Sequence, residues 1–339
     1  MIDRTLLAEA KGGDVSAQCR LGTIYERRKE NRKNCKRQNS KKAAFWYHKA
    51  AEQGDSLAQF LLGLHYDWND FEQAAIWYRK AAEQGDADAQ FRLADMYEEG
   101  FGLAVDFARA AFWYRQAAEQ GKPDAQHNLA FAYENGRGVR KNYAKAAAWY
   151  RKAIENPDYF EHETDLRLDL GILYRDGIKD FAQAAVWFRK AAEDGDLEAF
   201  VNLADLYAEG LGVHRNRKQA VTWYIKAASL GSIRAAVKLG EAYAEGKGVR
   251  KSFADAYYHL TLAALGMEEQ ERVIAEKKAG MAGANLTPAE LSKAKRRISR
   301  HLQAKRFAEQ RILELQKSQP RRALRRSTIP RPLRRWLSV

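Results

Sequence analysis

The stretch Trp77–Asp86 reads WYRKAAEQGD, and close copies of it begin at Trp46, Trp113, Trp149, Trp187 and Trp223. These Trp residues are spaced by 31, 36, 36, 38 and 36 positions, and His259 follows after another 36. A fixed period of about 20 to 50 residues is typical of a solenoid, in which each unit buries its apolar face only against its neighbours. Aromatic and alanine residues at helical spacing normally form core, so we predict that the copied phrase forms core and packs between repeats.

Each unit predicts two helices. In the third unit, Ala89, Leu93 and Tyr97 follow the i, i+4, i+8 spacing of one helical face, and the second helix carries the Trp-Tyr phrase. A Gly or Ala after the Leu, such as Gly63, allows a partner helix to approach closely. Turns such as EEGFGL place a Gly in the left-handed conformation past the first helix. We expect the length differences to lie in loops, including the basic insert at residues 27–39.

The pattern AxxxLGxxYxxGxGVxxxxxKAxxWYxKAAxQG resembles the Sel-one-like repeat, a relative of the tetratricopeptide repeat, and seven tandem copies cover residues 13–266. The resemblance implies an all-α fold, a right-handed α-solenoid with a concave inner surface, and an adaptor that binds other proteins. We expect a capping half-repeat at residues 1–12 and capping helices at residues 267–318, including one long helix over 288–318. Residues 319–339, with three prolines and no acid, form an Arg-rich tail that we expect to be unfolded when free.

The positive charge is confined to two segments. Residues 293–339 hold 16 of the 58 Lys and Arg but only two of the 44 acidic residues, so they carry the whole net charge of +14. Residues 26–42 hold nine bases against two acids, and the rest of the chain is mildly acidic. A charge distribution of this kind indicates local interaction surfaces or solvated segments rather than a basic scaffold.

The motifs of the common enzyme and metal classes are missing from the sequence. The seven histidines are scattered without HExxH spacing, and Cys19 and Cys35 do not form a metal-ligand pattern. The glycine-rich turns lack the Lys-Ser/Thr of a phosphate loop, and the SxxK match at Ser292 has no accompanying catalytic motif. We therefore expect a non-enzymatic protein without cofactor, metal or small-molecule substrate. With no apparent export signal or membrane span, we expect it to be cytoplasmic.

The resemblance also implies where a partner binds. In tetratricopeptide-like solenoids the first helix of each unit lines the groove, and the residue before the Leu-Gly or Leu-Ala pair faces inward. Arg92, Asn128, Asn202 and Lys238 occupy this position here, and we predict that they contact a peptide, with Phe131 as an apolar anchor. Arg and Asn suit this role because both can form paired hydrogen bonds. The alternative for each residue is an ordinary solvated helix position.

The tail offers a second candidate surface. Its candidate contact residues are Arg321, Arg322, Arg325, Arg326, Arg334, Arg335 and Trp336. Clustered arginines neutralise phosphates and a Trp can stack on a base, so nucleic acid is one possible partner. An anionic membrane surface is another, since Arg and Trp favour it. The third alternative is a solvated tail without a partner. The leading hypothesis is a scaffold that binds a protein or peptide in the concave groove.

Overall fold

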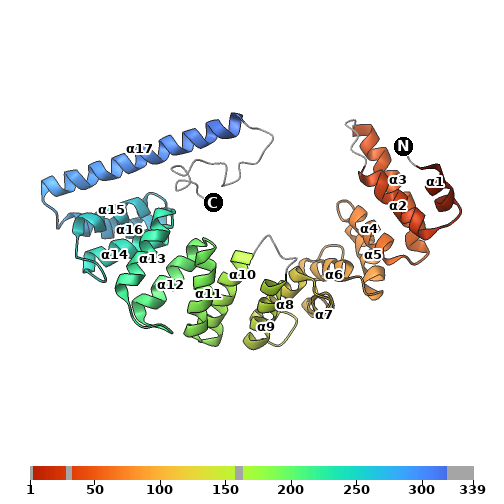
Figure 1. Ribbon diagram of the computed structural model, residues 1–339, viewed down its shortest axis with the longest axis horizontal. Helices are drawn as coiled ribbons and strands as arrows, with labels where there is room; N and C mark the ends of the chain where they lie inside the picture. Colours follow the sequence, from red (N-terminus) through yellow and green to blue (C-terminus); the bar gives the residue numbers. More distant parts are fainter. Residues whose placement is uncertain (1–2, 28–32, 157–162, 319–339) are drawn as a thin grey trace. The chain divides into compact units, whose positions relative to one another are not determined.

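A computed structural model describes residues 3–27, 33–156 and 163–318 of the protein (Figure 1). In these ranges all regular secondary structure is helical. The elements are α1 (Arg4–Lys11), α2 (Val15–Arg27), α3 (Lys33–Glu52), α4 (Ser56–Tyr66), α5 (Phe71–Glu83), α6 (Ala87–Glu99), α7 (Phe107–Glu119), α8 (Pro123–Asn135), α9 (Tyr143–Glu155), α10 (Glu163–Ile172), the π-helical η1 (Leu173–Ile178), α11 (Phe181–Glu193), α12 (Leu197–Glu209), α13 (Arg217–Ser229), α14 (Ile233–Glu245), α15 (Phe253–Ala264), α16 (Glu269–Gly283) and α17 (Pro288–Ser318). No helix in these ranges is both long and apolar enough to cross a membrane.

The helices form two compact units, Met1–Leu166 and Arg167–Val339. In the first unit, α2 and α3, α4 and α5, α6 and α7, and α8 and α9 pack as hairpins, and each hairpin packs against the next through α3 and α4, α5 and α6, and α7 and α8. In the second unit, α12 and α13 and α14 and α15 form hairpins that stack in the same way, and α15 also contacts α16 and α17. Each unit is an α-solenoid of helix pairs, which confirms the predicted fold class.

The ends of the helices follow from their sequence. Asp55, Asp86 and Asp196 each cap the N-terminus of a first helix by accepting a hydrogen bond from a backbone N–H three residues on. Gly136 ends α8 in the left-handed conformation with φ of 75°. The second glycine of the same turn, Gly138, also has a positive φ of 66°, and a Cβ on it would overlap the carbonyl group of Phe107. The turn therefore needs glycine because it lies directly against the preceding α7.

The Tyr of the repeated phrase explains why the phrase is repeated. The rings of Tyr47, Tyr78 and Tyr150 are fully buried between the two helices of a hairpin. Their hydroxyl groups donate to carboxylates at the end of the first helix, as in the bonds from Tyr47 to Glu26 and from Tyr150 to Glu134, both 2.8 Å. These hairpins are thus closed by an apolar ring with a satisfied polar tip, as buried tyrosines require. This confirms the prediction that the phrase forms core.

The glutamine of the phrase connects successive repeats of the first unit. Buried glutamines on the first helices donate from Nε2 to a carbonyl of the preceding helix at 3.0 or 3.2 Å; they are Gln18, Gln59, Gln90 and Gln126. The Oε1 atoms of the first three accept from Gln53, Gln84 and Gln120 of the repeated phrase, at 2.8, 2.7 and 2.8 Å. This chain of amide bonds stops at Gln126, because Asn156 stands where the repeated phrase has its glutamine. The second unit has Phe200 and Ala236 at two of the positions of the buried glutamines.

The basic insert departs from its expected structure, whereas the long C-terminal helix has the expected bounds. The expectation that the basic insert is a loop is wrong for its second half, because α3 begins at Lys33 and is 20 residues long. Helix α17 runs over Pro288–Ser318, as predicted. The Thr287 hydroxyl, which precedes it, and the Glu290 carboxylate form a capping box. Arg297 of α17 bonds to Asp255 at 2.6 Å and lies 3.9 Å from the ring centroid of Tyr258. These contacts attach α17 to α15.

Candidate functional site

The predicted groove residues all lie on first helices, but they divide between the two units. Arg92 lies on α6, and Asn128 and Phe131 lie on α8 in the first unit, whereas Asn202 lies on α12 and Lys238 on α14 in the second. Only the last two belong to one connected group of contacts. A peptide-contacting role for the set stays a prediction.

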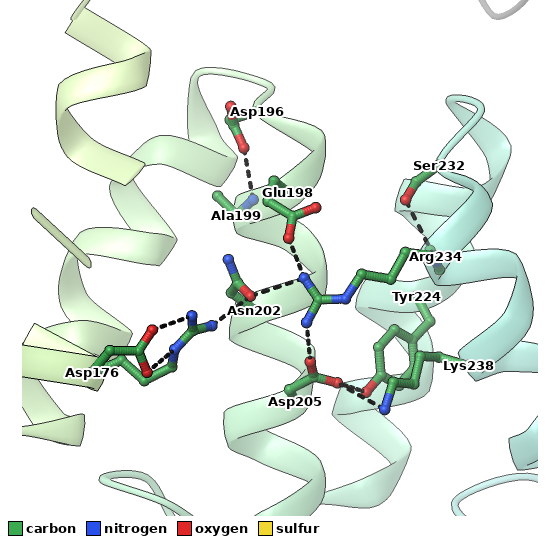
Figure 2. A network of polar contacts seen from close by, with 12 residues as sticks. Asp176, Asp196, Glu198, Ala199, Asn202, Asp205, Tyr224, Ser232, Arg234 and Lys238 are labelled. Atoms are coloured by element: carbon green, nitrogen blue, oxygen red, sulfur yellow. Dashed lines mark hydrogen bonds and ion pairs between the residues drawn. The ribbon is translucent and has the colours of Figure 1, made fainter. Parts of the chain in front are cut away.

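Asn202 is the centre of a polar network in the second unit (Figure 2). Its side-chain oxygen accepts hydrogen bonds from Arg175 at 2.8 Å and from Arg234 at 3.2 Å. The residue is only 1% exposed, so the expectation that its amide faces a groove ligand is not met. Two arginines cover the asparagine, and the accessible groups at this point are their guanidinium edges.

Arg175 reaches Asn202 because the fifth repeat departs from the pattern of the others. Arg175 occupies the position at which Glu98 and Glu134 accept a tyrosine hydroxyl bond in earlier repeats. The matching tyrosine is replaced by Phe188, and the Arg175 guanidinium lies 5.7 Å from the centre of that ring. The segment carrying Arg175 is the π-helical η1, and the residue that follows it, Lys179, is left-handed with φ of 65°. In this repeat Phe replaces the Tyr and Arg replaces the Glu, and the Arg175 guanidinium donates to Asn202 on α12 instead.

Arg234 of α14 joins the network from the opposite side. It pairs with Glu198, bonds to Asp205 Oδ2 at 2.8 Å, and donates to Asn202 (Figure 2). The other oxygen of Asp205 accepts from the Tyr224 hydroxyl and lies 4.0 Å from Lys238 Nζ. Burial, followed by the bond to Asp205, raises the pKa of Tyr224 far above its ordinary value, so the hydroxyl stays a donor.

The network is balanced in charge and fixed in geometry. Its cations are Arg175, Arg234 and Lys238, and its anions are Asp176, Glu198 and Asp205. Arg175 is paired with Asp176 at 2.6 Å, which holds its guanidinium in one orientation. Because these side chains already hold one another in place, they would lose less conformational entropy when a ligand binds.

In the first unit, the first helices α6 and α8 combine an exposed aromatic ring with acidic groups. Phe131 is 40% exposed, and the guanidinium of Arg137 lies 5.4 Å from its ring centroid. Arg137 also bonds to Glu98 at 3.3 Å, and the Tyr114 hydroxyl contacts both Glu98 and Asp95 at 2.7 Å. Burial raises the pKa of Asp95 to about 6. Arg92 is exposed on α6 and Asn128 is half-buried one turn before Phe131.

Sequence reasoning missed Arg175, Arg234 and Asp205 as members of the network. The signal for Arg175 was present, because the fifth repeat lacks both the usual Glu and the usual Tyr. Arg234 carried no comparable signal. The tail residues Arg321, Arg322, Arg325, Arg326, Arg334, Arg335 and Trp336 lie outside the described residues, so their contact with nucleic acid or membrane stays a prediction. In the described part of the chain, no three His, Cys, Asp or Glu side chains gather in a way that could hold a metal ion.

Comparison with known proteins agrees with the architecture. The Sel1 repeat family matches seven segments of the chain: residues 15–55, 56–86, 87–122, 123–158, 167–196, 198–232 and 233–266. No curated protein matches the chain.

Several solved structures are similar to it. A protective antigen present in uropathogenic Escherichia coli strains, which displays an SLR fold, is 31% identical, with 94% of this chain and 67% of that one covered and a TM-score of 0.58. A Sel1 repeat protein from Oxalobacter formigenes is 33% identical over 67% of this chain and 97% of its own, with a TM-score of 0.52. The C-terminal part of a TPR repeat-containing protein from Cytophaga hutchinsonii, 13% identical with a TM-score of 0.50 over 77% of this chain and 98% of its own, shares the fold. With seven matching repeats over most of its length, the chain belongs to the Sel1 repeat family.

Proposed function

We propose that the protein is a non-enzymatic scaffold that binds a peptide segment of a partner protein on the first-helix surface of its second unit. The observation that carries this proposal is the network around Asn202, in which Arg175 and Arg234 from neighbouring repeats are held in place on a single buried amide. A fixed array of donors and acceptors across adjacent repeats suits a ligand that runs across the helices. The membership in a repeat family that mediates protein contacts supports the same conclusion.

The chemistry of the network favours a polypeptide backbone. Arg234 and Lys238 are each more than 40% exposed, so their remaining N–H groups can donate to peptide carbonyls. Glu198 and Asp176 are about half exposed and can accept from peptide N–H groups. Since cations and anions balance, the surface does not select for a strongly charged ligand. A peptide with neutral or mixed side chains fits it best.

The first unit would add a second contact to the same kind of ligand. Phe131 offers an exposed ring for an apolar side chain, with Asn128 one helical turn away and Arg92 on the preceding first helix. The proposal assigns these three residues an auxiliary role.

The test begins with selection of binding peptides from a random library on the immobilised full-length protein. The affinity of a selected peptide is then measured for the wild type and for the double variant Arg234→Ala with Lys238→Ala. We expect affinity to fall at least tenfold, because two donors are lost and Asp205 is left without its cations. Circular dichroism of each variant checks that the helices remain.

The matched control is Lys190→Ala with Lys218→Ala on α11 and α13, where both side chains are exposed and lie on second helices of hairpins. This variant removes the same two charges from the same unit and should keep the wild-type affinity. Failure to select any peptide, or equal affinities for the two double variants, would contradict the proposal.

A further inference from the structure

We propose that a basic cleft on α7, α8 and α9 of the first unit binds an extended acidic peptide. The basic cleft consists of two adjoining cavities of about 540 and 460 Å³, which share Arg115, Tyr133 and Lys145. The first cavity continues to Arg140 and Lys141, and the second to Lys152. Volumes of this size suit a small ligand or a short stretch of peptide. The cleft lies on another unit than the Asn202 network, so it stands independently of the function proposed above.

The cleft carries a positive charge that the protein does not neutralise. Its cations are Arg115, Arg140, Lys141, Lys145 and Lys152, and Glu119 is the acidic residue on its wall. Among the described residues, none of these five cations forms an ion pair with a carboxylate. The Asn202 network, by contrast, pairs its cations with acids. A cluster of unpaired cations in a hollow favours an anionic ligand.

Aromatic rings hold these cations in place. The Nζ atom of Lys145 lies 5.3 Å from the ring centroid of Tyr133, and that of Lys152 lies 4.2 Å from the ring centroid of Trp149. Arg115 donates from Nη2 to the Tyr133 hydroxyl at 2.9 Å. Cation–π contacts of this kind restrain the long side chains and leave N–H groups free for a ligand. The charged groups of the cleft are therefore preorganised.

The cation at the position of Lys145 recurs in the first unit but is missing from the second. The bond from Arg115 to Tyr133 recurs as the bond from Arg189 to Tyr207, also 2.9 Å, in the second unit. The matching residues are Lys42 in α3 and Arg109 in α7, which also lie over tyrosine rings. In α11, α13 and α15 they are Gln183, Gln219 and Asp255. The later repeats keep the packing and lose the cation. Lys145 differs from Arg109 in that it shares a cavity with Arg140 and Lys141, whereas Arg109 is paired with Asp106.

A peptide fits the cleft better than nucleic acid does. Single-stranded nucleic acids bind by stacking bases on open aromatic faces. Here Lys152 covers a face of Trp149, Lys145 covers a face of Tyr133, and Tyr133 is buried. The rings serve as supports for cations and offer no platform to a base. Carboxylates need only the ammonium and guanidinium groups.

The spacing of the cations predicts the spacing of the carboxylates. Lys145 and Lys152 are seven residues apart on α9, which corresponds to about 10 Å along a helix axis. A polyproline II peptide rises about 3.1 Å per residue and repeats its orientation every three residues, so Glu side chains at i and i+3 point the same way about 9 Å apart. The cleft should therefore prefer a Glu-x-x-Glu pattern.

The experiment measures fluorescence anisotropy of three labelled probes with the full-length protein: (Glu-Pro-Pro)₃, (Gln-Pro-Pro)₃ and a nine-nucleotide oligothymidylate. The test variant is Lys145→Glu with Lys152→Glu. The matched control is Lys190→Glu with Lys226→Glu, two lysines of the second unit that also lie over Trp rings. Both double variants change the net charge of the protein equally and leave the Arg-rich tail intact. Any general electrostatic attraction of the anionic probe to the protein therefore changes by the same amount in each.

We expect the wild type to bind the Glu probe at least tenfold more tightly than the Gln probe. The test variant should lose at least tenfold in affinity for the Glu probe, and the control should stay within about twofold of the wild type. Equal losses in both variants, no measurable binding of the Glu probe, or tighter binding of the oligonucleotide that depends on Lys145 and Lys152 would each overturn the proposal. Thermal unfolding checks folding, and Lys145→Gln with Lys152→Gln replaces the test variant if the Glu pair unfolds; it should still lose affinity.

Discussion

Gly63 of α4 lies directly against the buried ring of Tyr78 on α5. A Cβ placed on Gly63 would come 2.5 Å from both Cδ1 and Cε1 of that ring. Gly22 and Gly171 stand in the same relation to Tyr47 and Phe188. The small residue after the Leu of the repeat is thus explained by the aromatic residue of the repeated phrase, because the two meet inside the hairpin.

The substitution Gly63→Ala should lower the free energy of unfolding by about 1 to 3 kcal/mol, because Tyr78 has no room to move away. This loss would occur even though Ala favours a helix over Gly by about 1 kcal/mol. Gly280→Ala on α16 is the control, since nothing lies within 4 Å of an added Cβ there. Chemical denaturation followed by circular dichroism should show a destabilised Gly63 variant and an unchanged or stabilised Gly280 variant.

The substitution Gln90→Leu should interrupt the chain of glutamines. It removes the bond to the Ala82 carbonyl, 3.2 Å, and the acceptor for Gln120, 2.8 Å. A buried carbonyl without a partner costs about 1 to 3 kcal/mol, so the first unit should unfold at lower denaturant concentration. Gln73→Leu, at an exposed position of α5, should change the midpoint little. Equal midpoints for the two variants would show that the chain of amides contributes nothing to stability.

Asp95 should destabilise the first unit at neutral pH. Burial raises its pKa to about 6, so the folded state binds a proton more readily than the unfolded state between about pH 4 and 6. The contribution of Asp95 to the free energy of unfolding therefore falls as the pH rises from about 4 to 6. Asp95→Asn should raise the free energy of unfolding by about 1 to 2 kcal/mol at pH 7 and by much less at pH 4.

The exposed Glu99→Gln provides the same change of charge as a control for Asp95→Asn. Denaturation of both variants at pH 4 and pH 7 checks the prediction. A stabilisation by Asp95→Asn that is the same at both pH values would show that the gain has another cause than the buried carboxylate.

His259 should have the opposite pH dependence. Burial, followed by the charge of Arg297, lowers its pKa to about 4, and its ring stacks parallel to that of Tyr243 with centroids 5.7 Å apart. The unfolded state takes up the proton near pH 6.5 and the folded state only near pH 4, so stability is lost as pH falls through this window. His259→Phe should make α15–α17 less sensitive to acid.

Hydrogen exchange of α15–α17 at pH 5 and pH 7, corrected for intrinsic rates, measures this effect. His214→Phe, at an exposed turn position, should leave the acid sensitivity as it is in the wild type. If His259→Phe and the wild type lose protection equally on acidification, the titration of His259 is not its source.

Much of the architecture could be predicted from the sequence because the same phrase occurs at nearly constant spacing. The repeat placed the helix pairs, the glycine turns and the buried Trp-Tyr phrases, since each of these depends on residues close together in the chain. Contacts between repeats were harder to predict. The bond from Gln84 to Gln59 joins residues 25 positions apart, and nothing in either glutamine alone indicates burial.

The candidate site could be predicted only in outline. The position of Asn202 on a first helix was correct, but its burial was not foreseen, because it depends on arginines from the repeats on either side. Arg175 reaches it through a π-helical turn, a local change that periodicity does not reveal. The expected loop at the basic insert was wrong for a related reason, since α3 simply extends toward its N-terminus and the hairpin accommodates the added turns.

The most direct test of the scaffold function is hydrogen exchange of the full-length protein with and without a selected peptide ligand. The account predicts that protection increases in α12 and α14, around Asn202 and Lys238, and stays unchanged in α13 on the other side of the hairpins. It also predicts that Arg234→Ala with Lys238→Ala abolishes this protection. Protection confined to α13 or to residues 319–339, with α12 and α14 unaffected, would contradict the account.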